Sequence, residues 1–256
     1  MVWKDLCAVD ADGDSDFVGT THMRKCGRPM TKRSQARVQA VFFDFGYTLW
    51  NEERAWTEWA QWLGVSMLDF FTVLGSVIER GEHHHRAFEV FRPGIDLARE
   101  RELRRKAGQI DEFRPEELYP DVMQCLGKLK AAGYSIGVAG NHFADFAEKL
   151  RRMNAPIDFI GSSEEWGAEK PSPEFFARIA EVAGVSPAEI AYVGDRVDND
   201  VLPAKAAGMA SVFLRRGPWG LIHAQRPEIA EADIRIDSLD ELPSALAEWL
   251  AREKTT

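Results

Sequence analysis

The sequence is poor in cysteine, in long apolar runs and in positive charge. Three cysteines among 256 residues are too few and too scattered for a disulfide framework, so free thiols in a reducing compartment are expected. No apolar run approaches the roughly 18 residues that a membrane-spanning helix needs, and no secretory leader pattern opens the chain. A formal net charge of −9 disfavours nucleic acids and anionic membranes as partners. We therefore expect a cytoplasmic protein that acts on a small molecule, and nothing in the composition indicates its oligomeric state.

Residues 1–36 differ in composition from the rest of the chain. An acidic stretch, DADGDSDFVG, runs into a basic one, RKCGRPMTKRSQAR, and neither has the periodicity of a helix or a strand. The alternating acids Asp10, Asp12 and Asp14 lack, at the required positions, the Gly and Glu of a calcium-binding EF-hand loop. We expect residues 1–36 to form a mobile or loosely docked extension.

From Val38 onward, short apolar segments alternate with amphipathic ones. The apolar segments are VQAVFFDF, YSIGVAGN, IDFIGSS, IAYVGD, ASVFLRR and IRID. The amphipathic segments are YPDVMQCLGKLKAAG, HFADFAEKLRRM, PEFFARIAEVAG, NDVLPAKAAG and ELPSALAEWLARE. In the second of these, the inward face is expected to carry Phe143, Phe146, Ala147 and Leu150. The alternation predicts a Rossmann-like α/β fold, a mostly parallel sheet with helices on both faces, formed by residues 37–51 and 113–256.

Residues 52–112 break this alternation, because they are typical of helices only. The helical segments are AWTEWAQWLG, MLDFFTVLGSVIERG, HHHRAFEVF and IDLARERELRRKAG. We expect an inserted all-helical cap domain over the carboxyl edge of the sheet. Trp56, Trp59 and Trp62 recur at near-helical spacing, which is more typical of a packed core than of a ligand-binding wall. The charged run RERELRRK is more typical of a solvated helix face.

Four features occur in order along the chain. One strand ends in Asp44 within DFGYT, a second ends in Asn141 within VAGN, Lys170 precedes a helix in GAEKPSPEFF, and a further strand leads into GDRVDNDVLPAKAAGM. Ligands of parallel α/β sheets bind at the carboxyl ends of the strands, where these acids and this amide fall. Over residues 38–240 the set resembles the haloacid dehalogenase-like superfamily of hydrolases, many of which carry a helical cap between their first two motifs.

The resemblance implies a role for each of these residues. Asp44 corresponds to a nucleophile that takes a phosphoryl group as an aspartyl-phosphate, which water then hydrolyses. Four oxygen donors would hold Mg²⁺, a hard cation that offsets the repulsion between carboxylate and phosphate: Asp44, Asp195, Asp200 and the backbone carbonyl of Gly46. Lys170 would stabilise the transferring group, and Asn141 would hold a phosphoryl oxygen or the leaving group. Each position taken singly also suits a surface lysine or a helix-capping acid, but their joint order favours a Mg²⁺-dependent phosphatase of a small phosphorylated metabolite.

Two positions depart from the family pattern. Gly46 stands where most phosphatases of the superfamily carry a second Asp that protonates the leaving group. Gly140 stands where Ser or Thr is usual, although its backbone N–H can still reach a phosphoryl oxygen. Three interpretations stay open: a phosphatase with its acid elsewhere, a dehalogenase or phosphonate-type hydrolase, and a module that binds a phosphorylated ligand or a protein without turnover. Dehalogenation needs no Mg²⁺, so the intact fourth motif argues against it, and His142 is the candidate replacement acid, ahead of the histidine run 83–85.

The segment FLRRGPWG places Arg215, Arg216 and Trp219 just after a strand. An arginine there could clamp a second anionic group of the substrate, so Arg215 is a candidate substrate contact. The alternative, a basic pair at a strand end beside a packed tryptophan, is slightly favoured.

Overall fold

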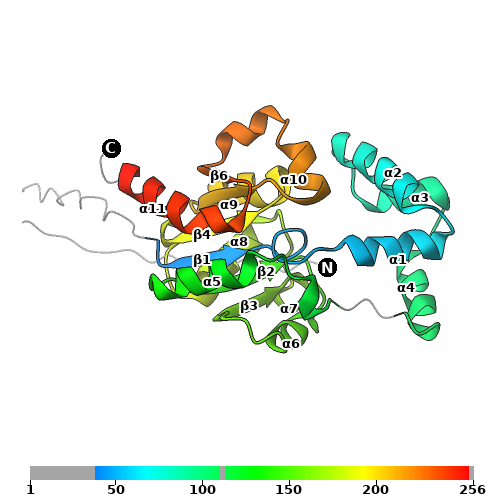
Figure 1. Cartoon of the computed structure of the whole chain (residues 1–256), viewed down its shortest axis with the longest axis horizontal. Coiled ribbons are helices and arrows are strands. Elements are labelled where there is room, and N and C mark those ends of the chain that lie inside the picture. The colour runs from blue at the N-terminus through cyan, green and yellow to red at the C-terminus, as the bar shows by residue number, and fades with distance from the viewer. Residues whose placement is uncertain (1–37, 110–112, 254–256) are drawn as a thin grey trace, which may run out of the picture. The chain divides into compact units, whose positions relative to one another are not determined.

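The computed structural model describes residues 38–109 and 113–253, and six strands in it form one parallel sheet (Figure 1). The strands are β1 Ala40–Phe43, β2 Ser135–Gly140, β3 Phe159–Ser162, β4 Ile190–Gly194, β5 Ala210–Leu214 and β6 Ile234–Ile236. Their order is β3-β2-β1-β4-β5-β6, so the first strand is central and the chain winds outward on both its sides. The predicted Rossmann-like fold class is confirmed. The extension predicted for residues 1–36 lies outside the described residues.

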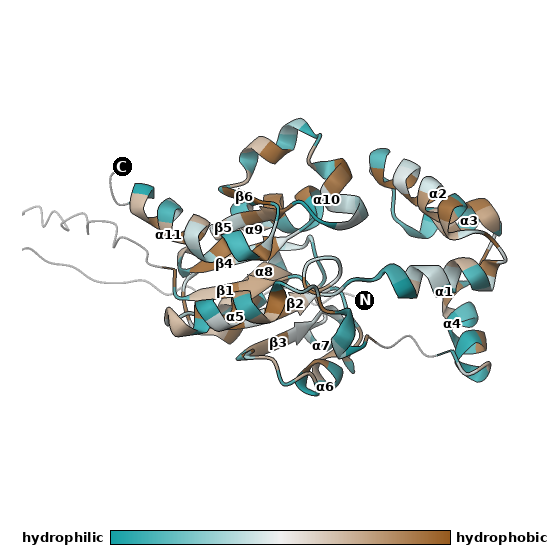
Figure 2. Cartoon of the chain, in the orientation of Figure 1, coloured by the Kyte–Doolittle hydropathy of each residue, from teal (hydrophilic) through white to brown (hydrophobic). Residues whose placement is uncertain are grey.

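Alternate residues of the strands face two separate cores, one on each side of the sheet. Val41 and Phe43 of β1 pack with α5, α6 and α11, whereas Ala40 and Phe42 pack with α8 and α9. The helices of this part are α5 Val122–Ala131, α6 Phe146–Arg151, α7 Ser163–Trp166, α8 Pro173–Ala183, α9 Leu202–Ala206, α10 Gly217–His223 and α11 Leu242–Glu253. Hydrophilic and hydrophobic residues alternate along α5 and α11, as expected of amphipathic covering helices (Figure 2).

Short 3₁₀-helical turns and a π-helical turn, η3, connect these elements. They are η1 Pro115–Glu117, η2 Pro187–Glu189, η3 Val197–Val201, η4 Pro227–Glu231 and η5 Leu239–Glu241. The boundaries of α8 illustrate how the sequence sets a helix: the Ser172 hydroxyl accepts the Phe175 N–H, Pro173 opens the helix, and Gly184 closes it at φ 67°. Within the described residues no single helix is long and apolar enough to cross a membrane, and α1 and α2 pass that test only as a pair bent by 108°.

Four helices lie between β1 and η1 and share a core of their own. They are α1 Glu53–Leu63, α2 Met67–Glu79, α3 His85–Phe91 and α4 Leu97–Lys106. Phe70, Leu74 and Phe88 are buried there with Trp59, so the tryptophan spacing does belong to a core. The same cluster reaches Trp219 of α10, against which α2 packs. The helical insertion is therefore present, while its division from the rest at residues 52 and 112 stays a prediction.

The prediction that Phe143 faces the core is wrong. Helix α6 begins at Phe146, and Phe143 precedes it with a side chain that is 61% exposed. Glu164 Oε2 of α7 accepts the backbone N–H of Ala144 at 2.7 Å, which gives this N–H a partner outside α6. The exposed Phe143 ring lies 5.7 Å from Cζ of Arg101 in α4.

The charged run in α4 is not wholly solvated, contrary to the prediction for it. Arg104 is fully buried, and its guanidinium carbon lies 4.1 Å from the ring centroid of Trp59. Its Nε donates to Gln109 Oε1 at 3.2 Å, and Glu58 Oε2 lies 3.5 Å from Nη2. A buried guanidinium over an aromatic ring is part of the core of the insertion, because the planar cation stacks on the ring face.

Candidate active site

The carboxyl ends of β1 and β4 bring two acids side by side. Phe43 and Val193 are paired in neighbouring strands, and the backbone N–H of Asp44 donates to Val193 O at 2.8 Å. Asp195 follows β4 directly after Gly194. Both acids come at the point where a buried strand leaves the core, which is why an apolar segment can end in a carboxylate. Asp44 is 9% exposed and Asp195 is 2% exposed.

Lys170 links this pair to a third acid. Its Nζ lies 2.8 Å from Asp44 Oδ1 and 2.6 Å from Asp200 Oδ1, and all three side chains are buried. Burial alone would lower the pKa of Lys170, but the carboxylates of Asp200 and Asp44 raise it well above its ordinary value. The lysine is therefore a fixed positive charge between two carboxylates.

The carboxylates of Asp44, Asp195 and Asp200 together exceed the charge that Lys170 can offset. One oxygen from each lies within 4.8 Å of the others. Burial, and then the charges of Asp200 and Asp44, raise the pKa of Asp195 well above its ordinary value, because its negative charge is disfavoured beside these groups. Among the described residues, Asp195 Oδ2 has no hydrogen-bond partner although it is buried. This set of three oxygen donors fits a hard divalent cation such as Mg²⁺.

Two glycines make room for these acids. A Cβ on Gly194 would collide with the carboxyl group of Asp200, so only glycine lets β4 end there. A Cβ on Gly140, at the end of β2, would lie 2.7 Å from Asp44 Oδ1 and 2.7 Å from His142 Nε2. The space that a Ser or Thr side chain would take at position 140 is thus filled by Asp44 and His142.

Asn141 has a contact that sequence reasoning did not anticipate. Its Oδ1 accepts the backbone N–H of Lys170 at 2.7 Å, and its Nδ2 donates to Lys170 O at 2.9 Å. The amide therefore fixes the backbone from which the Lys170 side chain extends. The predicted contact of Asn141 with a phosphoryl oxygen stays a prediction, whereas the positioning contact is present.

His142 is close to Asp44 but is a weak candidate for an acid. Burial lowers its pKa to about 4, with Asp44 opposing and Lys170 adding to this effect, so the ring is neutral at physiological pH. The ring stacks on Phe146 at a centroid distance of 4.0 Å, and its buried Nε2 has no hydrogen-bond partner among the described residues.

The loop after Asp44 turns back on itself and brings a different carboxyl group to the site. Phe45 O accepts the N–H groups of Leu49 and Trp50 at 2.8 and 2.9 Å, and Trp50 O accepts the N–H of Tyr47 at 2.8 Å. Because of this tight loop, the chain enters α1 beside Gly46. A Cβ on Gly46 would lie 2.5 Å from Oε1 of the residue that precedes α1, Glu52.

Glu52 is a site residue that the sequence analysis missed. Trp56 Nε1 donates to its Oε2 at 3.0 Å, within the first turn of α1. Burial raises the pKa of Glu52 to about 7; the Trp56 hydrogen bond opposes this rise and the charge of Asp44 adds to it. The only hint in the sequence was a Trp four residues after a Glu, and many surface helices carry such pairs. The pair lies beside Gly46 because the loop after Asp44 turns back, which the sequence did not reveal.

Arg215, the predicted substrate contact, is not brought to the carboxylates. Its guanidinium pairs with the exposed Asp237, with Nη2 2.7 Å from Oδ2. The neighbouring Arg216 instead links the loop after Asp44 to the start of α5, because it donates to Thr48 O at 3.1 Å and pairs with Asp121. The alternative interpretation, a basic pair beside the packed Trp219, is the one that these contacts favour.

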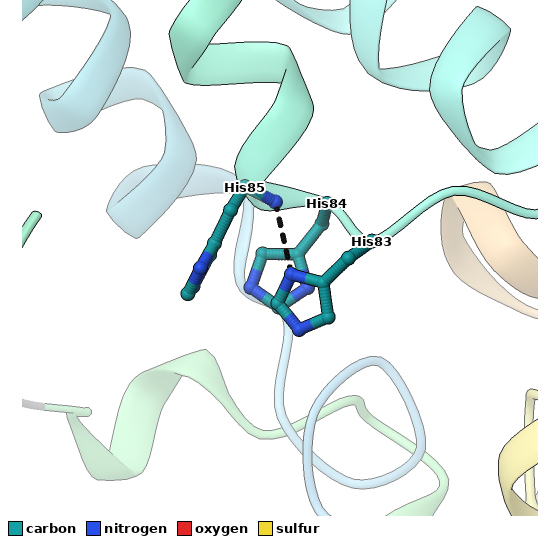
Figure 3. Close-up of side chains that lie close together, drawn as sticks. All are labelled: His83, His84 and His85. Carbon is teal, nitrogen blue, oxygen red and sulfur yellow. Dashed lines mark hydrogen bonds between the residues drawn. The ribbon is translucent and has the colours of Figure 1, made fainter. Parts of the chain in front are cut away.

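The histidine run at residues 83–85 forms a compact cluster in the cap (Figure 3). Ring centroids of these three residues lie 4.2–4.6 Å apart, and His83 Nδ1 accepts the backbone N–H of His85 at 3.3 Å. Burial lowers the pKa of each, that of His84 to about 3, and His84 contacts the rings of Trp56 and Trp219. These imidazoles are neutral at physiological pH, so none offers an imidazolium proton.

A small cavity of about 160 Å³ adjoins this edge of the sheet. Phe45, the residue after Asp44, lines it with His142 and Phe146, and Arg54, Glu58, Asp145 and Lys149 bring charges to it. A second cavity, of about 370 Å³, lies at the amino ends of β1 and β2, beside Gln39 and Ser135, and so at the opposite edge from the carboxylates. Of these two cavities, the smaller lies at the edge of the sheet that carries the carboxylates.

Comparisons with known proteins agree with the motif order. Residues 38–208 match the family described as haloacid dehalogenase-like hydrolase. The chain is 33% identical over 200 residues to a glyceraldehyde 3-phosphate phosphatase from Methanopyrus kandleri, covering 71% of this chain and 86% of that protein. A crystal structure of a HAD phosphatase from Thermococcus onnurineus is similar with a TM-score of 0.53 and 26% identity, covering 82% of this chain and 98% of the other. The fold is also that of a β-phosphoglucomutase from Clostridium difficile, with a TM-score of 0.61, 17% identity, and coverage of 86% and 100%.

Proposed function

This chain belongs to the haloacid dehalogenase-like hydrolase family, and from that premise we propose that it is a Mg²⁺-dependent phosphatase of a small phosphorylated metabolite. The observation that carries the proposal is the buried cluster of Asp44, Asp195 and Asp200, in which Lys170 pairs with Asp44 and Asp200. Such a group suits a divalent cation and a phosphate dianion together, because each offsets the charge of the other.

Asp44 is the nucleophile in this proposal. One of its carboxylate oxygens attacks phosphorus, the bond from phosphorus to the ester oxygen breaks, and an aspartyl-phosphate forms. Lys170 contacts Asp44 Oδ1 directly, so it orients the nucleophile and offsets charge on the transferring group. Asp44, Asp195 and Asp200 would hold Mg²⁺, which supplies Lewis-acid stabilisation of the phosphoryl oxygens when bound.

The substrate proposal rests on the relatives and on the size of the cavity. The relative named glyceraldehyde 3-phosphate phosphatase acts, by its name, on a short phosphorylated compound, and we propose a substrate of the same class. A cavity of about 160 Å³ beside Phe45 and His142 suits a short substrate, and it lies below the range of about 300–1,000 Å³ that is usual for larger ligands.

The test is hydrolysis of a panel of phosphorylated metabolites and an aryl phosphate, with Mg²⁺ and with EDTA. We expect turnover with Mg²⁺, its loss in EDTA, and a fall of about 10³-fold or more in Asp44→Asn, which keeps the shape of the side chain but removes the nucleophile. Dehalogenation of a haloacid that survives EDTA would support the dehalogenase alternative instead. No turnover of any ester, together with phosphate binding, would support the binding-module alternative.

A further inference from the structure

Fast hydrolysis of an alkyl phosphate calls for an acid as well as a nucleophile. When the bond from phosphorus to an alkyl oxygen breaks, the departing alkoxide is a strong base, and a proton delivered to it lowers the barrier. Asp44 is committed to the attack, and Lys170 holds both Asp44 and Asp200. The remaining acid, Asp195, belongs to the cation-binding set, so a separate donor is required.

The space beside Gly46 holds a candidate for that donor. The backbone of Gly46 is not in the left-handed conformation that favours glycine. A side chain at this position would instead collide with the carboxyl group of Glu52. Oxygen Oε1 of Glu52 lies 2.5 Å from the position that a Cβ on residue 46 would take. The carboxyl group therefore occupies the space beside position 46, two residues past the nucleophile, although Glu52 is eight residues past it in sequence.

The orientation of this carboxyl group is fixed from the cap side. Trp56 Nε1 holds Oε2 at 3.0 Å, and among the residues that the structure describes Oε1 takes part in no hydrogen bond. The free oxygen is thus the one that faces Gly46.

We propose that Glu52 is the acid–base catalyst of this enzyme and replaces, from the start of the cap, a carboxyl group that position 46 lacks. The inference rests on the proposed phosphatase function. In the first step an Asp44 oxygen bonds to phosphorus, the bond to the ester oxygen breaks, and the proton on Glu52 passes to that oxygen, so that an alcohol leaves. In the second step the Glu52 carboxylate takes a proton from water, whose oxygen bonds to phosphorus. The bond between phosphorus and Asp44 then breaks, and phosphate, Asp44 and protonated Glu52 are restored.

The test compares first-turnover and steady-state rates on two esters, an alkyl phosphate and an aryl phosphate with a nitrophenolate leaving group, in the presence of Mg²⁺. In Glu52→Gln, which preserves size and the Trp56 hydrogen bond, the first turnover of the alkyl ester should slow by about 10²–10⁴-fold. First turnover of the aryl ester should change by less than about threefold, because its leaving group departs without a proton. Steady-state turnover should fall on both, with the phosphoryl adduct accumulating on Asp44 and detectable by mass spectrometry after acid quench.

The matched control is Glu53→Gln, the exposed neighbour in the same turn, which should leave both rates unchanged. Equal loss of first-turnover rate on the two esters, or no loss on either, would overturn the assignment of Glu52 while leaving the phosphatase intact. Absence of turnover in the wild-type chain would instead overturn the proposed function and this inference with it.

A second set of variants keeps the inference testable if Glu52→Gln folds poorly. Gly46→Asp alone should gain little activity, because Glu52 already supplies the carboxyl group and its Oε1 must shift from a position 2.5 Å from the new Cβ. Gly46→Asp combined with Glu52→Ala should recover at least about tenfold of the alkyl-ester rate that Glu52→Ala loses, because the carboxyl group returns to nearly the same place. A gain from Gly46→Asp alone, with no recovery in the double variant, would show that the two positions do not share one role.

Discussion

At the scale of single residues, the site depends on groups whose neighbours decide their charge. Lys170 keeps its proton because two carboxylates surround it, and Asn141 holds the backbone of that lysine through both ends of its amide. Residue types and order were enough to predict that Asp44, Lys170, Asp195 and Asp200 lie together, while their roles stay predictions. The contacts of Asn141 and the place of Glu52 could not be predicted, because both depend on which loop returns to which strand end.

His223 of α10 provides a pH-dependent contribution to stability. It is buried, and its Nδ1 accepts the backbone N–H of Val197 at 3.0 Å, so it is neutral in the folded state. Burial lowers its pKa to about 4, against an ordinary value of 6.5; Asp198 opposes this shift, and Arg226 and Arg196 add to it. A folded-state pKa below the unfolded one means that stability is complete above pH 6.5 and is lost as pH falls toward 4.

We expect His223→Asn to be less stable than wild type at neutral pH but to lose less stability on acidification. The Asn Oδ1 can accept the Val197 N–H and does not titrate, so the excess stability of wild type over the variant should shrink by about 3 kcal/mol between neutral pH and pH near 4. Urea unfolding at a series of pH values measures this. Parallel stability curves for the two proteins would show that His223 is not the titrating group.

At the scale of elements, periodicity predicted most helices and strands, and failed where a tertiary contact competed. Helix α6 was expected to include Phe143, but the backbone of Ala144 donates to Glu164, a partner that no local pattern reveals. The charge pattern of α4 predicted a solvated face, but Arg104 lies over Trp59, from a helix some forty positions earlier. In both cases the local sequence is ordinary, and the deciding partner is distant in the chain.

Helix α4 offers a matched pair of arginines that tests this point. Arg104→Ala should lower the free energy of unfolding by about 2–3 kcal/mol, because it removes the stacking on Trp59 and leaves a cavity. Arg105→Ala, at the next position and exposed, should change it by less than about 0.5 kcal/mol. Thermal and urea unfolding of the two variants decide between them. A similar small effect for both would mean that Arg104 is replaced by solvent without cost.

At the scale of the whole molecule, the four-helix insertion is joined to the sheet by more than its two connecting segments. Arg226, after α10, donates to Ile78 O at 2.6 Å and so binds the carbonyl end of α2, where a cation is favourable. The ring centroid of Trp219 in α10 lies 6.1 Å from that of Tyr47, in the loop after Asp44, and 6.1 Å from that of Trp56 in α1. The segment after β5 is therefore the main attachment of the insertion to the core.

Removing this attachment should loosen the insertion without unfolding the sheet. In Arg226→Ala we expect amide hydrogen exchange to quicken by about tenfold in α2 and α3, with little change in β1, β2 and β4. Arg80→Ala is the control, because Arg80 also ends α2 but pairs with Glu82 on the surface instead of reaching the core. Equal exchange in the two variants would show that only the helix end is affected.

The position of Glu52 at the start of α1 also bears on how such an enzyme can diversify. Its carboxyl group accepts a hydrogen bond from Trp56 of α1, so in the proposed mechanism the proton donor belongs to the insertion and the nucleophile to the sheet. A lineage that exchanged this insertion for another would lose the acid, Glu52, and keep the nucleophile, Asp44, unless residue 46 gained a carboxylate in the same event. Recombination between this chain and a relative should therefore yield active offspring only when the crossover keeps positions 46 and 52 from one parent, which makes the two sites a single unit of inheritance.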